Sequence, residues 1–133
     1  MTRNCHSTDS IVIPGTFETL NEFIKKNRQG YISGNSMKKR DQNIICRYLP
    51  KGIRYEYIDV IFSFYEPNAK RDKDNISGYF HKIFFDALVQ AGCIQNDGWK
   101  HIGDMTDRFY VDKCNPRIEV EIVDRSREKK VIL

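Results

Sequence analysis

Two carboxylates stand where an extended segment of the chain runs into a helix. Asp72 and Asp74 lie two residues apart in the run Lys70-Arg71-Asp72-Lys73-Asp74-Asn75. In an extended chain, positions i and i+2 point to the same side, so both carboxylates could bind one hard divalent cation. The neighbouring bases Lys70, Arg71 and Lys73 would attract a polyanion. Metal-binding acids among basic side chains are the groups that hydrolysis of nucleic-acid phosphodiesters requires.

Each of these residues also has a structural interpretation without chemistry. Asp72 and Asp74 are suitable acids for the N-terminus of a helix. A third acid, Asp97, follows the same helix, but Asn96-Asp97-Gly98 is also a good turn sequence. Lys82 lies in the middle of the helix, where it could form an i, i+4 ion pair with Asp86. His81, beside Lys82, is interpreted as a surface or partly buried histidine, and Trp99, which follows Asp97, as a core residue.

The elements that must position these groups alternate between strands and helices. Residues 10–13 and 54–65 are predicted strands, and the alternating apolar residues of 54–65 indicate a central strand covered on both faces. Thr16 is the expected N-cap of a helix over 17–28, Gly30 to Gly34 should interrupt helical structure, and a second helix is expected over 36–48. The longest helix is predicted over 75–91, closed by Gly92. A terminal hairpin of strands 107–112 and 117–123 completes the pattern.

The length of the long helix raises a question of geometry. It should span roughly 25 Å at 1.5 Å per residue, which separates Asp97 from Asp72 and Asp74. Either the chain after Gly92 doubles back along the helix, or the acids meet across a dimer interface. The sequence leaves both possibilities open.

Length and composition favour one soluble domain. The 133 residues are 40% hydrophobic and 30% charged, and no apolar run could span a bilayer. The N-terminus lacks the apolar core of a signal peptide, so a cytoplasmic location is expected. Four scattered cysteines without a Cys-x-x-Cys pair do not indicate zinc. We expect an α+β (mixed α/β) fold over residues 1–124, with a small mixed sheet packed by two to three helices, and a charged tail over 125–133.

Several motifs together resemble the RusA family of Holliday junction resolvases. They are Arg71-Asp-Lys-Asp-Asn75, then Lys82-Ile-Phe-Phe-Asp-Ala-Leu88, then Ala91-Gly92 and Asn96-Asp97, closed by a strand of the Arg117-Ile-Glu-Val-Glu-Ile type. The order of the motifs matches that family over about residues 65–124. The resemblance implies a homodimeric, Mg²⁺-dependent endodeoxyribonuclease, with Mn²⁺ as a substitute, that resolves four-way DNA junctions by paired symmetric nicks. Such enzymes serve DNA recombination and repair and are typical of phages and prophages in bacterial cells.

The resemblance also implies roles for individual residues. Asp72, Asp74 and Asp97 would bind the metal, and Lys82 would be the catalytic lysine of the helix. Lys70, Arg71 and Lys73, together with Lys38, Lys39 and Arg40, would contact DNA phosphates. The chain departs from the family pattern in two places. Its helix is about one turn longer, so that an alignment from the N-terminal end would place the lysine at Gly78, and Asn96 stands where an acid is frequent.

Two other functions are compatible with the same residues. The chain could be a non-catalytic module that binds nucleic acid, in which the acids are structural. It could also be a related metal-dependent nuclease that prefers other branched DNA, such as flaps or replication forks.

Overall fold

The computed structural model describes residues 7–126, apart from the side chain of residue 31, and places them in a single α+β domain. In chain order the elements are β1 (Thr8–Pro14), α1 (Leu20–Gln29), α2 (Tyr31–Cys46), β2 (Ile58–Glu66), α3 (Lys73–Gln90), β3 (Ile102–Val111) and β4 (Arg117–Asp124). The expected fold class is therefore confirmed. Most of the tail expected over 125–133 lies outside the described residues.

The four strands form one mixed sheet in the order β1-β4-β2-β3. β2 pairs antiparallel with β4 and parallel with β3, and α3 makes the crossover between the two parallel strands. The predicted terminal hairpin is therefore wrong, because β2 lies between β3 and β4. A parallel pair needs a long connection, which α3 and the loop after it supply.

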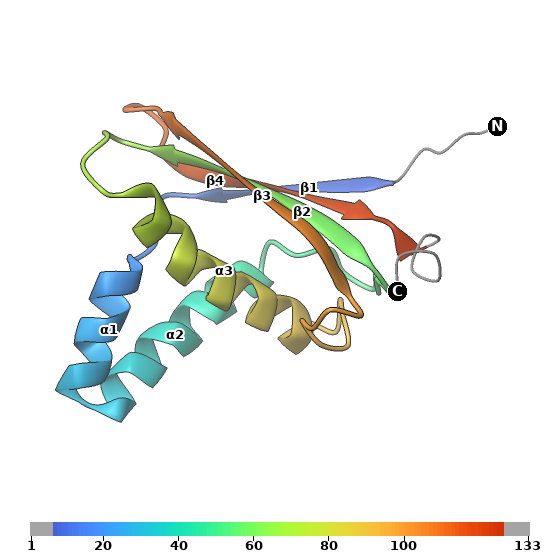
Figure 1. Ribbon diagram of the computed structural model, residues 1–133, viewed down its shortest axis with the longest axis horizontal. Coiled ribbons are helices and arrows are strands. Elements are labelled where there is room, and N and C mark those ends of the chain that lie inside the picture. The colour runs from blue at the N-terminus through green and yellow to red at the C-terminus, as the bar shows by residue number, and fades with distance from the viewer. Residues whose placement is uncertain (1–6, 127–133) are drawn as a thin grey trace.

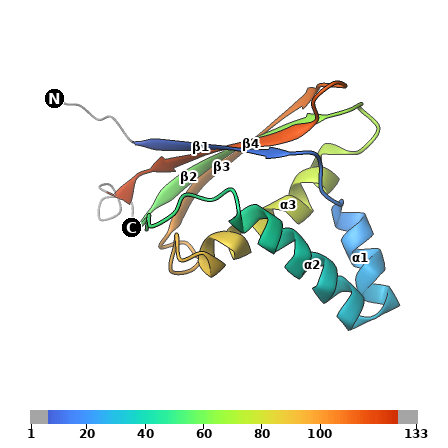
Figure 2. The same cartoon turned by 180° about the vertical axis from the view of Figure 1, so that it is seen from behind.

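All three helices lie on one side of the sheet, as the two opposite views agree (Figures 1 and 2). The core lies between the layers, where Phe62 of β2 meets Phe80 and Phe84 of α3 edge to face. β2 is an interior strand of the sheet, as predicted, but the predicted cover on both faces is wrong, because all three helices lie on one face (Figures 1 and 2). On the open face, Tyr65 is sandwiched between Tyr110 at 4.8 Å and the Arg117 guanidinium at 3.8 Å.

The first two helices differ from their predicted bounds for identifiable reasons. Thr19, not Thr16, is the N-cap of α1, where it forms a reciprocal capping box with Glu22. α2 begins at residue 31 and continues through Gly34, where the sequence predicted a break. A Cβ at position 34 would lie 1.7 Å from Asn27 Oδ1 of α1, so glycine at this position allows the two helices to approach closely.

Within residues 7–126, the helices are too short or too polar to cross a membrane.

Candidate active site

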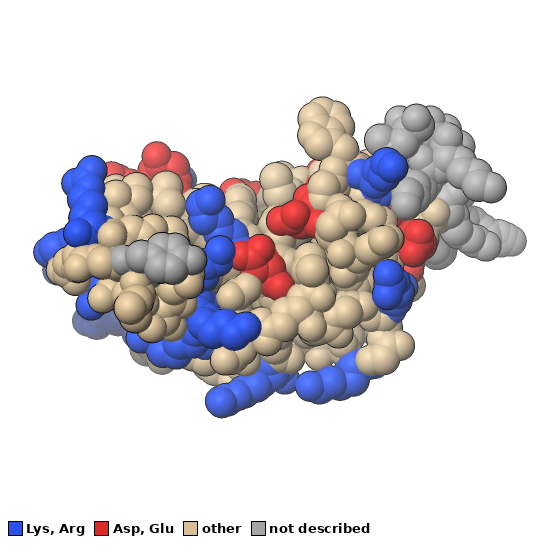
Figure 3. All heavy atoms as spheres, turned by 90° about the horizontal axis from the view of Figure 1, so that it is seen from below, with Lys and Arg blue, Asp and Glu red and all other residues tan. Residues whose placement is uncertain are grey.

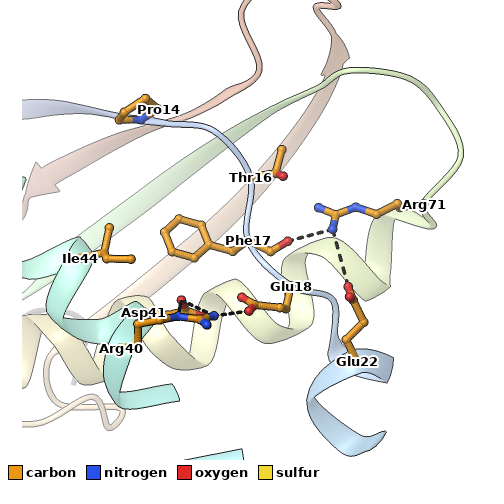
Figure 4. A pocket seen from close by; sticks show the side chains of 9 residues that line it. All are labelled: Pro14, Thr16, Phe17, Glu18, Glu22, Arg40, Asp41, Ile44 and Arg71. Carbon is orange, nitrogen blue, oxygen red and sulfur yellow. Dashed lines mark hydrogen bonds and ion pairs between the residues drawn. The ribbon is translucent and has the colours of Figure 1, made fainter. Parts of the chain in front are cut away.

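The turn from β2 into α3 is held by Arg71. Its guanidinium donates two hydrogen bonds to the buried Glu66 carboxylate, at 2.9 and 3.1 Å, and one to the Phe17 carbonyl at 2.8 Å. Figure 4 shows this guanidinium between the Phe17 carbonyl and Glu22 of α1. Arg71 therefore fixes the position at which α3 begins, and its charge is already paired.

Asp72 and Asp74 flank the first turn of α3. Asp72 is the N-cap residue by backbone geometry, yet its side chain makes no capping hydrogen bond. Within residues 7–126, its exposed carboxylate has no hydrogen bond or ion pair. Asp74 accepts a hydrogen bond from the neighbouring Asn75 N–H at 2.9 Å. The structural interpretation of Asp72 as a capping residue requires a hydrogen bond from its side chain to the helix N-terminus, and this bond is absent. The carboxylate is therefore available for a ligand.

Asp97 returns toward the middle of α3. Gly92, at φ 78°, adopts the left-handed conformation that ends the helix, and the Cys93 N–H donates back to the Leu88 carbonyl at 2.9 Å. The chain then reverses, anchored by the Tyr55 N–H on the Cys93 carbonyl at 2.7 Å. Asp97 thereby reaches a hollow of about 250 Å³ lined by His81, Lys82, Phe85, Asp97, Ile102 and Met105. The chain doubles back over about half the length of the helix.

Lys82, in the middle of α3, has an exposed side chain. The predicted ion pair between Lys82 and Asp86 is not formed, because Asp86 Oδ2 lies 3.0 Å from Lys38 Nζ of α2. Lys82 has no ion pair or hydrogen bond with any other described residue. Gly78, the alternative position for a family lysine, faces α1, where an added Cβ would lie 3.2 Å from Leu20 Cδ2. The space beside α3 therefore favours Lys82 over position 78.

The candidate residues fall into two groups along the seam between α3 and β3. Asp72 lies at one end, beside Lys73, Ile76 and Phe109, in a hollow of about 310 Å³. Lys82 lies ten positions further along α3, which is about 15 Å at 1.5 Å per residue, and Asp97 of the following loop lies in the same hollow as Lys82. No three His, Cys, Asp or Glu side chains among residues 7–126 are placed to hold one metal ion. The acids that the sequence grouped together are thus divided between two places.

The carboxylates at the start of α3 fit Mg²⁺ in the number of ligands that they can supply. Mg²⁺ is commonly bound by one or two carboxylates, with waters and substrate phosphate completing its shell. Asp72 and Asp74 can supply those two carboxylates, and Lys70 and Lys73 lie beside them. Asp97 does not belong to this set within the chain.

Sequence reasoning did not find the pair formed by His81 and Asp107. His81 Nε2 lies 2.8 Å from Asp107 Oδ1 on β3, and the imidazole packs 4.7 Å from the Phe62 ring. The sequence contains a signal for His81 alone, since it follows Asp74 by seven positions and so shares its face of α3. Trp99, expected in the core, is 89% exposed beside Asp97.

The six basic residues expected to contact phosphates differ in their freedom. Arg40 binds Glu18 and Asp41, Lys38 binds Asp86, and Arg71 binds Glu66. Lys39 and Lys70 have no side-chain partner among the described residues, and Lys73 Nζ lies 5.6 Å from the centre of the Phe109 ring. Figure 3 shows Lys and Arg side chains spread widely around the helix side of the molecule, with a few carboxylates between them. The exposed lysines 70 and 73 lie nearest to the acid pair.

The chain matches no protein-family model, and no curated protein matches it.

Proposed function

We propose that this protein is a metal-dependent endodeoxyribonuclease that cuts branched DNA, with the four-way junction as its substrate. The observation that carries the proposal is the return of Asp97 to Lys82. Two residues fifteen positions apart line one hollow, and the side chain of neither has a hydrogen bond or ion pair with any described residue. The ordered motifs that resemble the RusA family include both residues and the acid pair at the start of the same helix.

In this proposal Asp72 and Asp74 are the residues that would hold Mg²⁺ or Mn²⁺ at the N-terminus of α3. The ion would lower the pKa of bound water and screen the phosphoryl oxygens. Lys82 lies about 15 Å further along α3, so it would stabilise the charge that develops on the same phosphoryl group only where the two groups of residues meet across a dimer interface. Lys70 and Lys73 bind flanking phosphates. The products are a 5′-phosphate and a 3′-hydroxyl.

Cleavage of a four-way junction with and without Mg²⁺ or Mn²⁺ tests the proposal. Asp72→Asn should reduce nicking at least about 100-fold, because it removes a metal ligand. The same variant should bind the junction at least as tightly, since it also removes a negative charge near the phosphates. Glu121→Gln is the matched control, since it removes one negative charge from the open face of the sheet.

A second candidate, a nucleic-acid-binding module without catalysis, is favoured by the division of the acids into two groups. Purified protein that binds junctions but never nicks them in either metal would replace the nuclease by this function. Faster cleavage of flaps or forks than of four-way junctions would keep the nuclease and change its substrate.

A further inference from the structure

The hollow beside α3 contains a histidine to which the proposed function assigns no role. His81 lines it together with Lys82 and Asp97 and hydrogen-bonds Asp107 of β3. The three elements that meet here are α3, β3 and the loop after α3, and β2 lies beneath with Phe62. The charged groups around the imidazole are therefore Lys82, Asp97 and Asp107.

The hydrogen bond to Asp107 selects one tautomer of the ring. A carboxylate can only accept, so Nε2 at 2.8 Å must carry the hydrogen. The neutral ring then keeps its lone pair on Nδ1, which makes no hydrogen bond with any described residue. Contacts with Phe62 at 4.7 Å and Phe85 at 6.4 Å between ring centroids hold the imidazole in this orientation. A histidine oriented by a carboxylate, with its other nitrogen free, is the usual arrangement of a general base.

We propose that His81 is the general base of the hydrolysis and that Asp107 is its positioning residue. This inference rests on the proposed nuclease function and names a catalytic group beside Lys82 and Asp97, in the hollow that would meet the acid pair of a second copy across a dimer interface. The attacking water forms the new O–P bond and gives its proton to His81 Nδ1. Asp107 stabilises the imidazolium that results.

The leaving 3′-oxygen also needs a proton, which Lys82 can supply. As the bond between phosphorus and the 3′-oxygen breaks, its electron pair stays on that oxygen, which takes a proton from the Lys82 ammonium. The imidazolium then loses its proton to solvent, and the lysine amine regains one. The net reaction consumes one water and yields the 5′-phosphate and the 3′-hydroxyl.

Three variants of the full-length protein test the inference in an assay that measures nicking of an intact four-way junction. His81→Gln should lower the single-turnover rate by about 100-fold or more, the range of a lost general base, with junction affinity unchanged. Asp107→Asn should lower the rate comparably, because the amide can donate to Nε2 and so move the ring hydrogen to Nδ1. Asp107→Glu should recover part of the rate. Asp86→Asn, on the same helix but outside the hollow, is the control and should cut as wild type does.

A spectroscopic measurement stands independently of cleavage. In ¹⁵N-labelled protein, the two ring nitrogens of His81 should show the Nε2–H tautomer in the wild type and a shift toward Nδ1–H in Asp107→Asn. A wild-type ring in the Nδ1–H form would overturn the inference, whatever the activity.

The outcomes separate the inference from the function on which it rests. If wild type nicks junctions and His81→Gln nicks them equally fast, the general base is not His81 and the nuclease stands. If wild type nicks no branched or linear DNA in either metal, the nuclease fails, and the assignment of a base falls with it.

Discussion

At the residue scale, the basic run before α3 combines two different tasks. Arg71 is largely enclosed and binds the buried Glu66 carboxylate through two hydrogen bonds, whereas Lys70 is exposed and its ammonium has no partner among the described residues. Removing the arginine would leave a buried carboxylate uncompensated. The sequence predicts that both residues contact phosphates. In the structure Arg71 holds the turn before α3, and of these two described residues only Lys70 is free to bind a phosphate.

We therefore predict opposite effects of two alanine variants. Arg71→Ala should lower the free energy of unfolding by about 2–4 kcal/mol, because it breaks a paired, mostly buried charge. Lys70→Ala should change stability by less than about 0.5 kcal/mol and should weaken junction binding. Urea denaturation and fluorescence anisotropy measure the two quantities. Equal stability of both variants would mean that Arg71 does not hold the turn.

At the element scale, the end of α3 determines where Asp97 lies. Gly92 adopts φ 78°, a conformation that costs a residue with a Cβ about 1–2 kcal/mol. Gly92→Ala should therefore lower the free energy of unfolding by about that amount and should reduce cleavage by displacing Asp97. Gly92→Asn should cost less, because asparagine tolerates the left-handed region. Equal losses in the two variants would show that backbone conformation is not the cause.

The contact between the helices predicts a pH dependence. Glu18, before α1, faces Arg40 and Asp41 of α2 in the hollow of Figure 4. Burial raises the pKa of the Glu18 carboxyl above its ordinary value of 4.5, and the nearby Asp41 adds to the rise. A raised folded-state pKa means that the protonated form stabilises the fold, and this stability is lost as pH rises through that pKa.

Glu18→Gln removes this titration. The free energy of unfolding of the variant, relative to wild type, should therefore increase as pH rises from about 4 to 7. Parallel urea titrations across that range measure the difference, and Glu121→Gln serves as the control. A constant difference between Glu18→Gln and wild type would contradict the prediction.

The positions of the helices and strands along the chain were predictable from the sequence, whereas their contacts in space were less so. Alternation and helical periodicity located all seven elements, since these patterns report directly on which side of each element is buried. Partners in space were less accessible. Gly34 by itself indicates a break in the helix, and only its contact with Asn27 explains why a glycine stands inside α2. Likewise, spacing along α3 pairs Asp86 with Lys82, and only the packing of α2 against α3 brings Lys38 to Asp86. Trp99 has core character but lies in a loop anchored by its neighbours, so no local pattern predicts its exposure.

The candidate site was predictable in its residues but not in its arrangement. The acids and the lysine were singled out by the resemblance of their ordered motifs to a nuclease family, and their roles stay predictions. The division into two groups depends on how far the loop after Gly92 returns, which the Cys93 and Tyr55 backbone contact determines. Asp107 was also out of reach, because its meeting with His81 requires β3 to lie parallel to β2, where the sequence predicted a hairpin with β4.

At the scale of the whole molecule, the division of the acids makes the oligomeric state a question of chemistry. Two matched nicks in a four-way junction are most simply made by two sites related by a two-fold axis. β3 is an edge strand of the sheet, and its side chains Met105, Tyr110 and Val111 are 52%, 43% and 61% exposed. An exposed edge with apolar side chains is a surface on which a second copy can pair.

We predict that the protein is a homodimer whose two sites cut one junction together. Light scattering at micromolar concentration should give about twice the 15.7 kDa mass of the chain. On a plasmid with an extruded cruciform, wild type should produce linear DNA directly, because both strands are cut within the lifetime of one complex. Dimers formed with an excess of Asp72→Asn chains should instead yield nicked circles, since one of their two sites is inactive. A monomeric mass, together with linear product unaffected by the inactive chains, would show that each chain cuts alone, and the two acid groups would then have to act within a single protomer.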